Sequence, residues 1–261
     1  MIDIQKPQET TSAVRQAAAN TELGKLLAEH KASSGAGQVV GGLFIVLIGI
    51  FEMVLAGQMS DGGGPLVLLG VLFLIGGIIV MVLPATYQSH AAYCYEHGFV
   101  YTEGGPLQVF RWDKIPAVWI RIVRNYRNGV YVGTTYRYTI RRADGHEIVL
   151  SNKLDQIEKL GNLVEKKVTD YLLPKYIASY IKGNSLPFGV LNISQEGISN
   201  GVERVSWGQL KEIDVHQGVI RVKKDGKFFS WSSATVASIP NFTVFMTLVR
   251  AVQAGKLPTI A

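Results

Sequence analysis

Two long runs of apolar residues lie close together near the start of the chain, at 39–56 and 66–83. The first run contains one charged residue, Glu52, and the second contains none. Neither run shows the polar stripe that a surface helix of a soluble core carries every three to four residues. At ~1.5 Å per residue, about 18 helical residues extend roughly 27 Å, close to the ~30 Å hydrocarbon thickness of a bilayer. The pattern therefore predicts two transmembrane helices, at 39–57 and 65–84, joined as a hairpin.

The connector between the runs, QMSDGGG, is short, polar and rich in glycine, which suits a tight helix–helix turn. Gly49 and the Gly76–Gly77 pair fall at similar depth in such a hairpin, where small residues let two helices pack closely. The other interpretation is that glycine is simply common in membrane helices. Glu52 lies either at the membrane interface near the connector or on an ion path through the membrane. Because the runs offer it no second ionisable partner, the interface is favoured.

Basic residues near the runs predict their orientation. Lys25 and Lys31 precede the first run, whereas the connector contains no Lys or Arg. The positive-inside rule then places both termini in the cytoplasm of a multi-pass protein of the plasma (inner) membrane. The first 38 residues lack an early apolar stretch, so no cleavable signal peptide is expected and the first span would act as its own insertion signal.

From residue 93 onward, apolar and polar residues alternate in short stretches, a period-two pattern typical of β-strands. Asn128-Gly129 and Asp144-Gly145 indicate hairpin turns, because both dipeptides tolerate positive φ. A helix is expected after these strands, with a break at Pro174, and residues 175–182 would then form a further helical turn or a linker. The apolar residues that share one face of this helix are Leu154, Ile157, Leu160, Val164 and Val168.

The same order of elements returns after residue 184, with several strands and then a helix that opens at Pro240. Trp112 and Trp207 each lie on a strand that leads into the next one, which favours an internal repeat. A small β-barrel closed by a helix is a stable unit, because the helix covers an open end of the sheet. The expected fold class is therefore an α+β membrane protein. It combines the two-helix transmembrane hairpin with two tandem pleckstrin-homology-like (PH-like) β-barrels, each closed by a C-terminal helix.

Four parts are expected along the chain. They are a cytoplasmic N-terminal arm with a short helix at 1–38, the hairpin at 39–84, a first PH-like domain at 85–183 and a second at 184–261. Apolar residues between Ser12 and Lys31 predict the helix of the arm. That helix would lie on the membrane, pack on the first barrel or bind a partner, and the zero net charge of the arm gives it no electrostatic attraction to the membrane.

The sequence blocks EHGFVY, FRWDKI and NGVYVGTTYRYTIRRADG, and later FGVLNISQEGIS, SWGQL and IPNFTVF, follow the hairpin. Together with it they resemble a bacterial family of domains of unknown function. Members of that family look like an N-terminal two-helix membrane hairpin followed by PH-like cytoplasmic units. The resemblance covers the chain from about Leu23 onward. It implies the architecture, but no catalytic or ligand-binding residues.

The charge and the cysteine content of the chain indicate its cellular compartment and the chemical class of its partners. Of 26 Lys and Arg, 22 follow the second run, against 14 of 20 Asp and Glu, so this part carries a net charge of about +8. Such a domain is attracted to an anionic leaflet by about 1 kcal/mol for each well-placed Lys or Arg. The single cysteine, Cys94, allows no intramolecular disulfide, which fits a reducing compartment.

The sequence contains no recognisable catalytic or metal-binding motif. The five histidines include no i, i+4 pair, and there is no C-x-x-C, no P-loop, no G-x-G-x-x-G that opens a helix and no G-x-S-x-G elbow. His97 and His146 are expected as solvated turn residues, and Cys94 as a buried structural thiol. No cofactor and no metal are expected, and the sequence favours a protein that is not an enzyme.

The densest unusual feature is a cluster of arginine and tyrosine in the first β-domain. On alternating strands Arg121, Arg137 and Arg141 would project from one side, and guanidinium groups bind phosphate through paired hydrogen bonds. The other interpretation is that small barrels place Arg and Tyr on their solvent face in any case. The candidate ligand-binding residues are Arg121, Arg124, Arg127, Arg137, Arg141, Tyr126 and Tyr136.

These features predict a membrane-anchored cytoplasmic binding or scaffolding module. It would recognise anionic lipid headgroups, another membrane protein or a second copy of itself. The alternative is an enzyme that acts on a membrane-embedded or phosphorylated substrate. Nucleic acid is not expected as a partner, because the sequence carries no RNA- or DNA-binding module.

Overall fold

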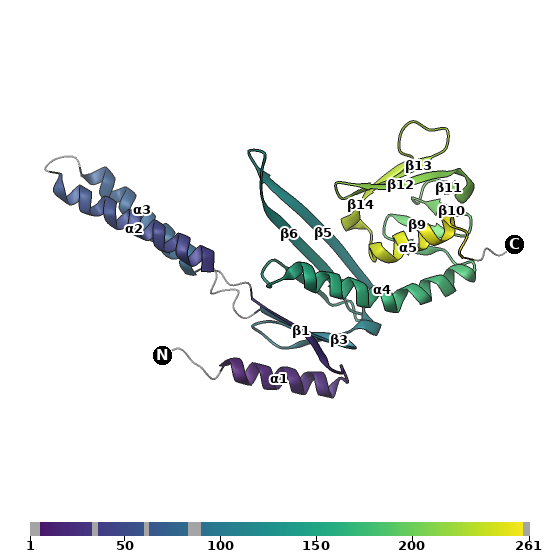
Figure 1. The fold of residues 1–261 in the computed structure, drawn as a ribbon, viewed down its shortest axis with the longest axis horizontal. Coiled ribbons are helices and arrows are strands. Elements are labelled where there is room, and N and C mark those ends of the chain that lie inside the picture. Colours follow the sequence, from purple (N-terminus) through teal and green to yellow (C-terminus); the bar gives the residue numbers. More distant parts are fainter. Residues whose placement is uncertain (1–5, 33–35, 60–62, 83–89, 258–261) are drawn as a thin grey trace.

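Two long apolar helices form a pair that stands apart from the rest of the chain in the computed structural model, which describes residues 6–32, 36–59, 63–82 and 90–257 (Figure 1). They are α2 (Ala36–Gln58) and α3 (Gly64–Val82). Both are long and apolar enough to cross a membrane, and only 17% and 11% of their most apolar windows are buried. The predicted hairpin of two apolar helices is therefore present, with bounds within three residues of the expected ones.

Glycines bring α2 and α3 into close contact. A Cβ added to Gly49 would lie 2.7 Å from the carbonyl oxygen of Gly70, and one added to Gly77 would lie 2.8 Å from that of Gly42. Real Cβ atoms do not approach so closely, so only glycine fits at these positions. The packing role predicted for Gly49 and Gly77 is confirmed, but the two face different partners, and Gly76 faces open space. We call Gly42, Gly49, Gly70 and Gly77 the glycine seam.

The first repeat contains two antiparallel sheets and a helix. The sheets have the strand orders β1-β2-β3-β4 and β5-β6-β7, and the 3-10 turn Trp112–Lys114 lies between β4 and β5 in the chain. The elements are β1 (Leu26–Lys31), β2 (His90–Tyr95), β3 (Gly98–Glu103), β4 (Gln108–Arg111), β5 (Ala117–Arg127), β6 (Val130–Arg141), β7 (Glu147–Ser151) and α4 (Ile157–Ile181).

The second repeat has the same order of elements. A four-stranded sheet with the order β11-β10-β9-β8 precedes a three-stranded sheet with the order β12-β13-β14, and the 3-10 turn Trp207–Gln209 again lies between the two in the chain. The elements are β8 (Leu186–Phe188), β9 (Leu191–Ser194), β10 (Gly197–Ser199), β11 (Arg204–Ser206), β12 (Leu210–His216), β13 (Val219–Lys224), β14 (Ser232–Thr235) and α5 (Phe242–Gln253).

The repeat extends to single hydrogen bonds. Nε1 of Trp112 donates to the carbonyl oxygen of Tyr95, at the end of β2, over 3.3 Å. Nε1 of Trp207 donates to the carbonyl oxygen of Ser194, at the end of β9, over 2.9 Å. Each tryptophan thus ties the turn between its two sheets to the second strand of its repeat. The internal repeat predicted around these tryptophans is therefore confirmed, but each tryptophan begins a 3-10 turn and does not lie on a strand.

The apolar helix pair is inserted between two neighbouring strands of the first sheet. β1 precedes the pair, β2 follows it, and the two strands are antiparallel with Lys31 opposite Ala91. In the second repeat the two residues Gly189-Val190 join the equivalent strands, β8 and β9. The first repeat therefore begins before the helix pair, while the division of the chain into domains stays a prediction.

The helix predicted between Ser12 and Lys31 is wrong in its second half. The helix α1 (Lys6–Asn20) ends at Asn20, and residues 26–31 form β1 instead. Val14 and Ala18 of α1 pack with Tyr93 and Val100 in a small buried cluster on the first sheet. Of the three roles open to the arm helix, packing on the first β-unit is the one that the structure shows.

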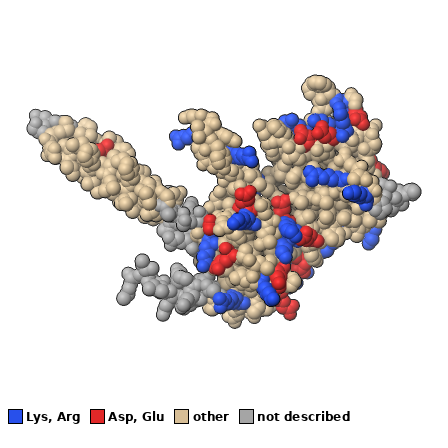
Figure 2. Space-filling view, viewed as in Figure 1, with Lys and Arg blue, Asp and Glu red and all other residues tan. Residues whose placement is uncertain are grey.

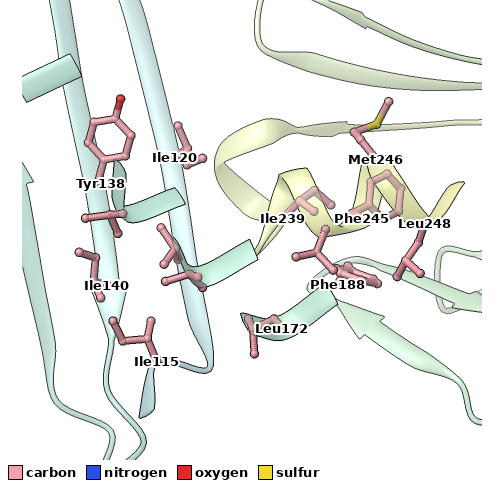
Figure 3. Close-up of a cluster of buried hydrophobic side chains, with 14 of the residues drawn as sticks. Ile115, Ile120, Tyr138, Ile140, Leu172, Phe188, Ile239, Phe245, Met246 and Leu248 are labelled. Carbon is pink, nitrogen blue, oxygen red and sulfur yellow. The ribbon is translucent and has the colours of Figure 1, made fainter. Parts of the chain in front are cut away.

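The two repeats share one hydrophobic core. The same cluster of buried residues extends from Ala92 in β2 through Leu160 in α4 to Val249 in α5. Figure 3 shows Leu172 of α4 close to Phe188 and Phe245 of the second repeat. The break expected at Pro174 is wrong, because α4 continues through it to Ile181, and residues 175–181 are helical, one of the two forms left open for them. Packing on both sides of the proline compensates for its cost of about 3 kcal/mol inside a helix.

The expected closed barrels are not present among the described residues, where the strands form four small separate antiparallel sheets. The edge strand β5 is instead covered by the second repeat through Asn241. The backbone N–H of Asn241 donates to the carbonyl oxygen of Val118 over 2.8 Å, and its Oδ1 accepts the N–H of Val118 over 3.0 Å. Nδ2 of Asn241 donates to the carbonyl oxygen of Pro116 over 2.8 Å. The architecture is mixed α+β, with small sheets around a shared core.

Candidate functional site

The arginine and tyrosine cluster lies on a long two-stranded ribbon. β5 and β6 contain 11 and 12 residues, but their neighbour β7 contains only five. We call residues 121–137 the ribbon, since β7 ends at Ser151 opposite Arg137. The predicted turn at Asn128-Gly129 closes it, and the φ values of +50° and +78° are those of a type I′ turn. At ~3.3 Å per residue, the ribbon extends roughly 20 Å beyond the three-stranded part of the sheet.

Two arginines lie directly opposite each other at the base of the ribbon. Arg121 pairs with Arg137, and Arg141 lies four residues further along β6 on the same face. Residues directly opposite in an antiparallel pair point to the same side of the sheet. The prediction that these three arginines share a side is therefore confirmed by the strand register.

The three arginines differ in their charge compensation. Arg141 forms an ion pair with Glu147 at 2.6 Å, and its guanidinium lies 4.7 Å from the ring centroid of Trp119. Among the described residues, Arg121 and Arg137 have no carboxylate within ion-pair distance. Like charges directly opposite on neighbouring strands destabilise a sheet. Arg121 and Arg137 are thus a cross-strand pair of like charges that no carboxylate compensates among the described residues.

The other four candidate residues lie elsewhere on the ribbon. Arg124 and Tyr136 belong to the opposite face, because Ile120 and Tyr138 of that face are buried in the core. There Tyr136 stacks on Tyr138 with ring centroids 6.5 Å apart, and a hydrogen bond with Glu158 raises the pKa of Tyr136. Tyr126 and Arg127 follow an irregularity in the strand register and lie next to the closing turn. The seven residues therefore do not converge on one site.

The ribbon projects to the side on which the chain leaves for the helix pair. The carbonyl oxygen of Lys31, the last residue of β1, accepts the N–H of Asp155 over 2.8 Å, and Ala32 pairs with Leu154. These contacts place the end of β7 beside the end of β1, and the ribbon continues past the end of β7. In Figure 1 the ribbon and the helix pair both extend from the sheets toward the upper left.

A family model described as "Family of unknown function (DUF6585)" matches residues 4–256. The chain belongs to this family. The resemblance of the sequence blocks to a family of unknown function is therefore confirmed over nearly the whole chain. Neither the curated proteins nor the solved structures contain a match to it.

Sequence reasoning missed the apolar part of the ribbon of this DUF6585 chain. Ile122, Val130, Tyr131 and Val132 are large apolar or aromatic residues, and each has between 50% and 66% of its surface exposed. The sequence does contain a signal, because residues 117–142 include six arginines and no Asp or Glu. Alternation alone predicts that half of a strand is buried, so it could not show that this segment projects beyond its sheet.

Asn152 supports the base of the ribbon and was also missed. Its Oδ1 accepts the backbone N–H of Tyr136 over 2.7 Å, and its Nδ2 donates to the carbonyl oxygen of Thr134 over 2.9 Å. The side chain thus continues the hydrogen bonding of β6 past the end of β7. These contacts hold the strand that carries Arg137 in a fixed position.

The remaining polar candidates of the DUF6585 chain show no catalytic arrangement. Nε2 of His146 hydrogen-bonds Oε1 of Gln108 over 2.7 Å in an exposed position. Cys94 is fully buried, and burial raises the pKa of its thiol to about 12. Glu52 is half-buried on α2, and its Oε2 has no hydrogen-bond partner among the described residues. No group of three or more His, Cys, Asp or Glu able to hold a metal occurs in the part of the chain that the structure describes.

Proposed function

We propose that this chain is a membrane-anchored cytoplasmic binding module that recognises anionic lipid headgroups. In this proposal α2 and α3 cross the plasma (inner) membrane, and both termini lie in the cytoplasm. The Arg121–Arg137 pair, which lacks a carboxylate partner among the described residues, is the observation that supports headgroup binding most directly.

The place of the helix pair in the fold supports a membrane hairpin. β1 and β2 are hydrogen-bonded neighbours, so the chain must leave the first sheet and return to it on the same side. Two spans satisfy this requirement, whereas a single span would leave β1 and β2 on opposite sides of the bilayer. Lys25 and Lys31 before α2, with no Lys or Arg between the helices, favour the cytoplasm for this side.

The geometry of the arginine pair suits a phosphate group. Each guanidinium presents a planar fork of N–H donors, and phosphate oxygens accept paired hydrogen bonds from it. A headgroup phosphate between Arg121 and Arg137 would relieve the repulsion between the two side chains. The order of elements in each repeat, four strands and three strands closed by a helix, supports our further proposal that the repeats are PH-like.

The test uses the full chain in nanodiscs of neutral lipid or of neutral lipid mixed with phosphatidylglycerol. A fluorophore on Thr135→Cys reports on the site, because residue 135 pairs with Val123 next to the arginine pair on the same face. A small share of the lipid carries a nitroxide quencher on its headgroup. We expect stronger quenching in the anionic nanodiscs than in the neutral ones.

Two double variants identify the cause of this quenching. Arg121→Gln with Arg137→Gln should reduce the quenching in anionic nanodiscs to the neutral level. Lys211→Gln with Lys227→Gln removes the same charge from exposed positions of the second repeat and should leave it unchanged. Equal quenching in both lipids, or quenching that survives the loss of both arginines, would contradict headgroup binding at this site.

A further inference from the structure

The tip of the ribbon is apolar although it is exposed. We call residues 126–132 the ribbon tip. Within it Tyr126, Val130, Tyr131 and Val132 have 61%, 66%, 54% and 60% of their surface exposed. The rings of Tyr126 and Tyr131 form an edge-to-face pair with centroids 5.9 Å apart. An exposed cluster of this kind in a soluble segment marks a surface that binds another apolar phase.

The ribbon tip has little to stabilise it if water is its only surrounding. An isolated two-stranded ribbon is at best marginally stable in water, because it has no third element on which to pack its side chains. Here the strands extend well past β7, and apolar side chains occur on both of their faces, with Ile122 on one and Val123 on the other. Such a ribbon gains stability where an apolar surface surrounds it.

The charges around the ribbon tip are all of one sign. Arg124 and Arg127 flank Tyr126, and no Asp or Glu occurs anywhere in residues 117–142. On the face shown in Figure 2, the upper part of the ribbon has Lys and Arg atoms among uncharged ones, without acidic atoms. Tyrosine and arginine beside aliphatic residues are the composition of protein segments at a membrane–water interface.

The second repeat provides an internal comparison. Its equivalent strands, β12 and β13, contain only seven and six residues, and β12 carries the acidic residues Glu212 and Asp214. Only the repeat that holds the apolar helix pair has the long, apolar and purely basic ribbon. The ribbon also projects to the side on which the chain leaves for that pair, because Lys31 and Ala32 contact Asp155 and Leu154, which closely follow the end of β7.

We infer that the ribbon tip inserts into the headgroup and upper acyl region of the same leaflet that α2 and α3 enter. This inference rests on the proposed function for the membrane position of the helix pair and gives the ribbon a second, apolar contact with the bilayer. Tyr126, Val130, Tyr131 and Val132 lie in the interface, while Arg124 and Arg127 reach the phosphates above it. A ribbon inclined to the membrane plane also brings the arginine pair at its base, roughly 20 Å from the tip, to the level of the headgroups.

The experiment places an environment-sensitive fluorophore on Tyr131→Cys in the full chain, reconstituted in nanodiscs of neutral phosphatidylcholine. Lipids brominated near the top of the acyl chain act as short-range quenchers. Gln217→Cys, on the equivalent turn of the second repeat, is the matched control. We expect a blue-shifted emission and clear quenching for the label at residue 131, and water-like, unquenched emission for the label at residue 217.

A triple variant distinguishes insertion of the ribbon tip into the bilayer from proximity of the tip to the bilayer surface. Tyr126→Ser, Val130→Ser and Val132→Ser together should abolish the quenching of the label at residue 131, and because all three side chains are exposed, thermal unfolding should show a folded protein. Water-like emission at residue 131 in the unaltered ribbon overturns the inference, as does quenching that persists in the triple variant.

Each of the two proposals can be contradicted without contradicting the other. Insertion is measured in neutral lipid and does not require Arg121 or Arg137, whereas headgroup binding is measured as a difference between anionic and neutral lipid at residue 135. Quenching at residue 131 without any anionic effect at residue 135 supports insertion and contradicts headgroup recognition. Stronger quenching of residue 135 in anionic lipid, together with an unquenched label at residue 131, supports headgroup recognition and contradicts insertion.

Discussion

At the scale of single residues, the central feature is a pair of like charges that the fold holds together. Arg121 and Arg137 are opposite neighbours, and the hydrogen bonds of Asn152 fix the strand beside Arg137. Arg141 on the same face has Glu147 and Trp119 as partners. The sequence contains acidic residues close by, at Asp144 and Glu147, but they compensate Arg142 and Arg141 and leave the pair uncompensated.

Relief of this repulsion should stabilise the protein in the absence of anionic lipid. We expect Arg137→Thr to raise the free energy of unfolding by about 0.2–1 kcal/mol, because it removes a like-charge cross-strand pair and introduces a good strand former. Thermal unfolding of the full chain in a neutral detergent measures the change. Arg141→Thr is the control, since it removes an ion pair with Glu147 and should not stabilise. Lower stability of Arg137→Thr would show that Arg137 has a compensating partner.

Cys94 gives a second prediction at this scale. Burial raises the pKa of its thiol to about 12, so the reactive thiolate is scarce at any pH below that value. We expect no modification of Cys94 by a maleimide at neutral pH in the folded protein, and full modification in denaturant, as measured by intact-mass spectrometry. Rapid modification of the folded chain would mean that the first sheet opens readily.

At the scale of elements, the glycine seam explains how α2 and α3 pack. Gly49 lies against the backbone of Gly70, so a larger side chain has no room unless the helices separate. We expect Gly49→Val to destabilise the pair by about 1–3 kcal/mol, the usual cost of overpacking. Titration with a denaturing detergent measures it. Gly76→Val, where the added group meets open space, should have little effect. Equal sensitivity at both positions would contradict the seam.

Elements with a local signal were predictable from the sequence. The apolar runs gave α2 and α3, and the Asn-Gly and Asp-Gly dipeptides gave the turns of the β5–β6 and β6–β7 hairpins. β1 was missed because LLAEHK has no strand signal of its own. Its extended form depends on pairing with β2, which follows only after the whole helix pair. Pro174 was misjudged for a similar reason, since packing of α4 on both repeats outweighs the local preference of proline.

The candidate site was predictable only in part. Alternation along the strands was enough to place Arg121, Arg137 and Arg141 on one face. The same alternation already puts Tyr136 and Arg124 on the other face. It could not show that Arg141 is neutralised by Glu147, because that contact depends on the register between strands. It also could not give the length of the ribbon beyond β7, which depends on where a third strand stops.

At the scale of the whole molecule, the helix pair is an insertion between two neighbouring strands of the first repeat. The chain enters the pair from β1 and returns into β2, and Lys31 and Ala32 contact Asp155 and Leu154, which follow β7 in the chain. The second repeat shares the core and covers the edge of β5 through Asn241. This arrangement connects the ribbon to the sheet from which the chain enters the helix pair and to which it returns.

The proposed topology predicts which parts of the chain are accessible from outside the cell. Met59, at the end of the pair far from the sheets, is half-exposed, and Gln217 lies on the second repeat. In spheroplasts, a membrane-impermeant maleimide should label Met59→Cys at once and Gln217→Cys only after lysis. Buried Cys94 contributes no background. Labelling of Gln217→Cys in intact spheroplasts would reverse the orientation, and immediate labelling of both would argue against a membrane hairpin.

The most direct test of the central claim is hydrogen–deuterium exchange of the full chain in nanodiscs, at about 0.15 M salt, where charges further apart than about 8 Å are screened. If the arginine pair holds anionic headgroups, backbone amides of residues 121–137 exchange more slowly in phosphatidylglycerol-containing nanodiscs than in neutral ones, and Arg121→Gln with Arg137→Gln removes the difference. Identical exchange of the ribbon in both lipids, or slowing that persists in the double variant, would contradict the account.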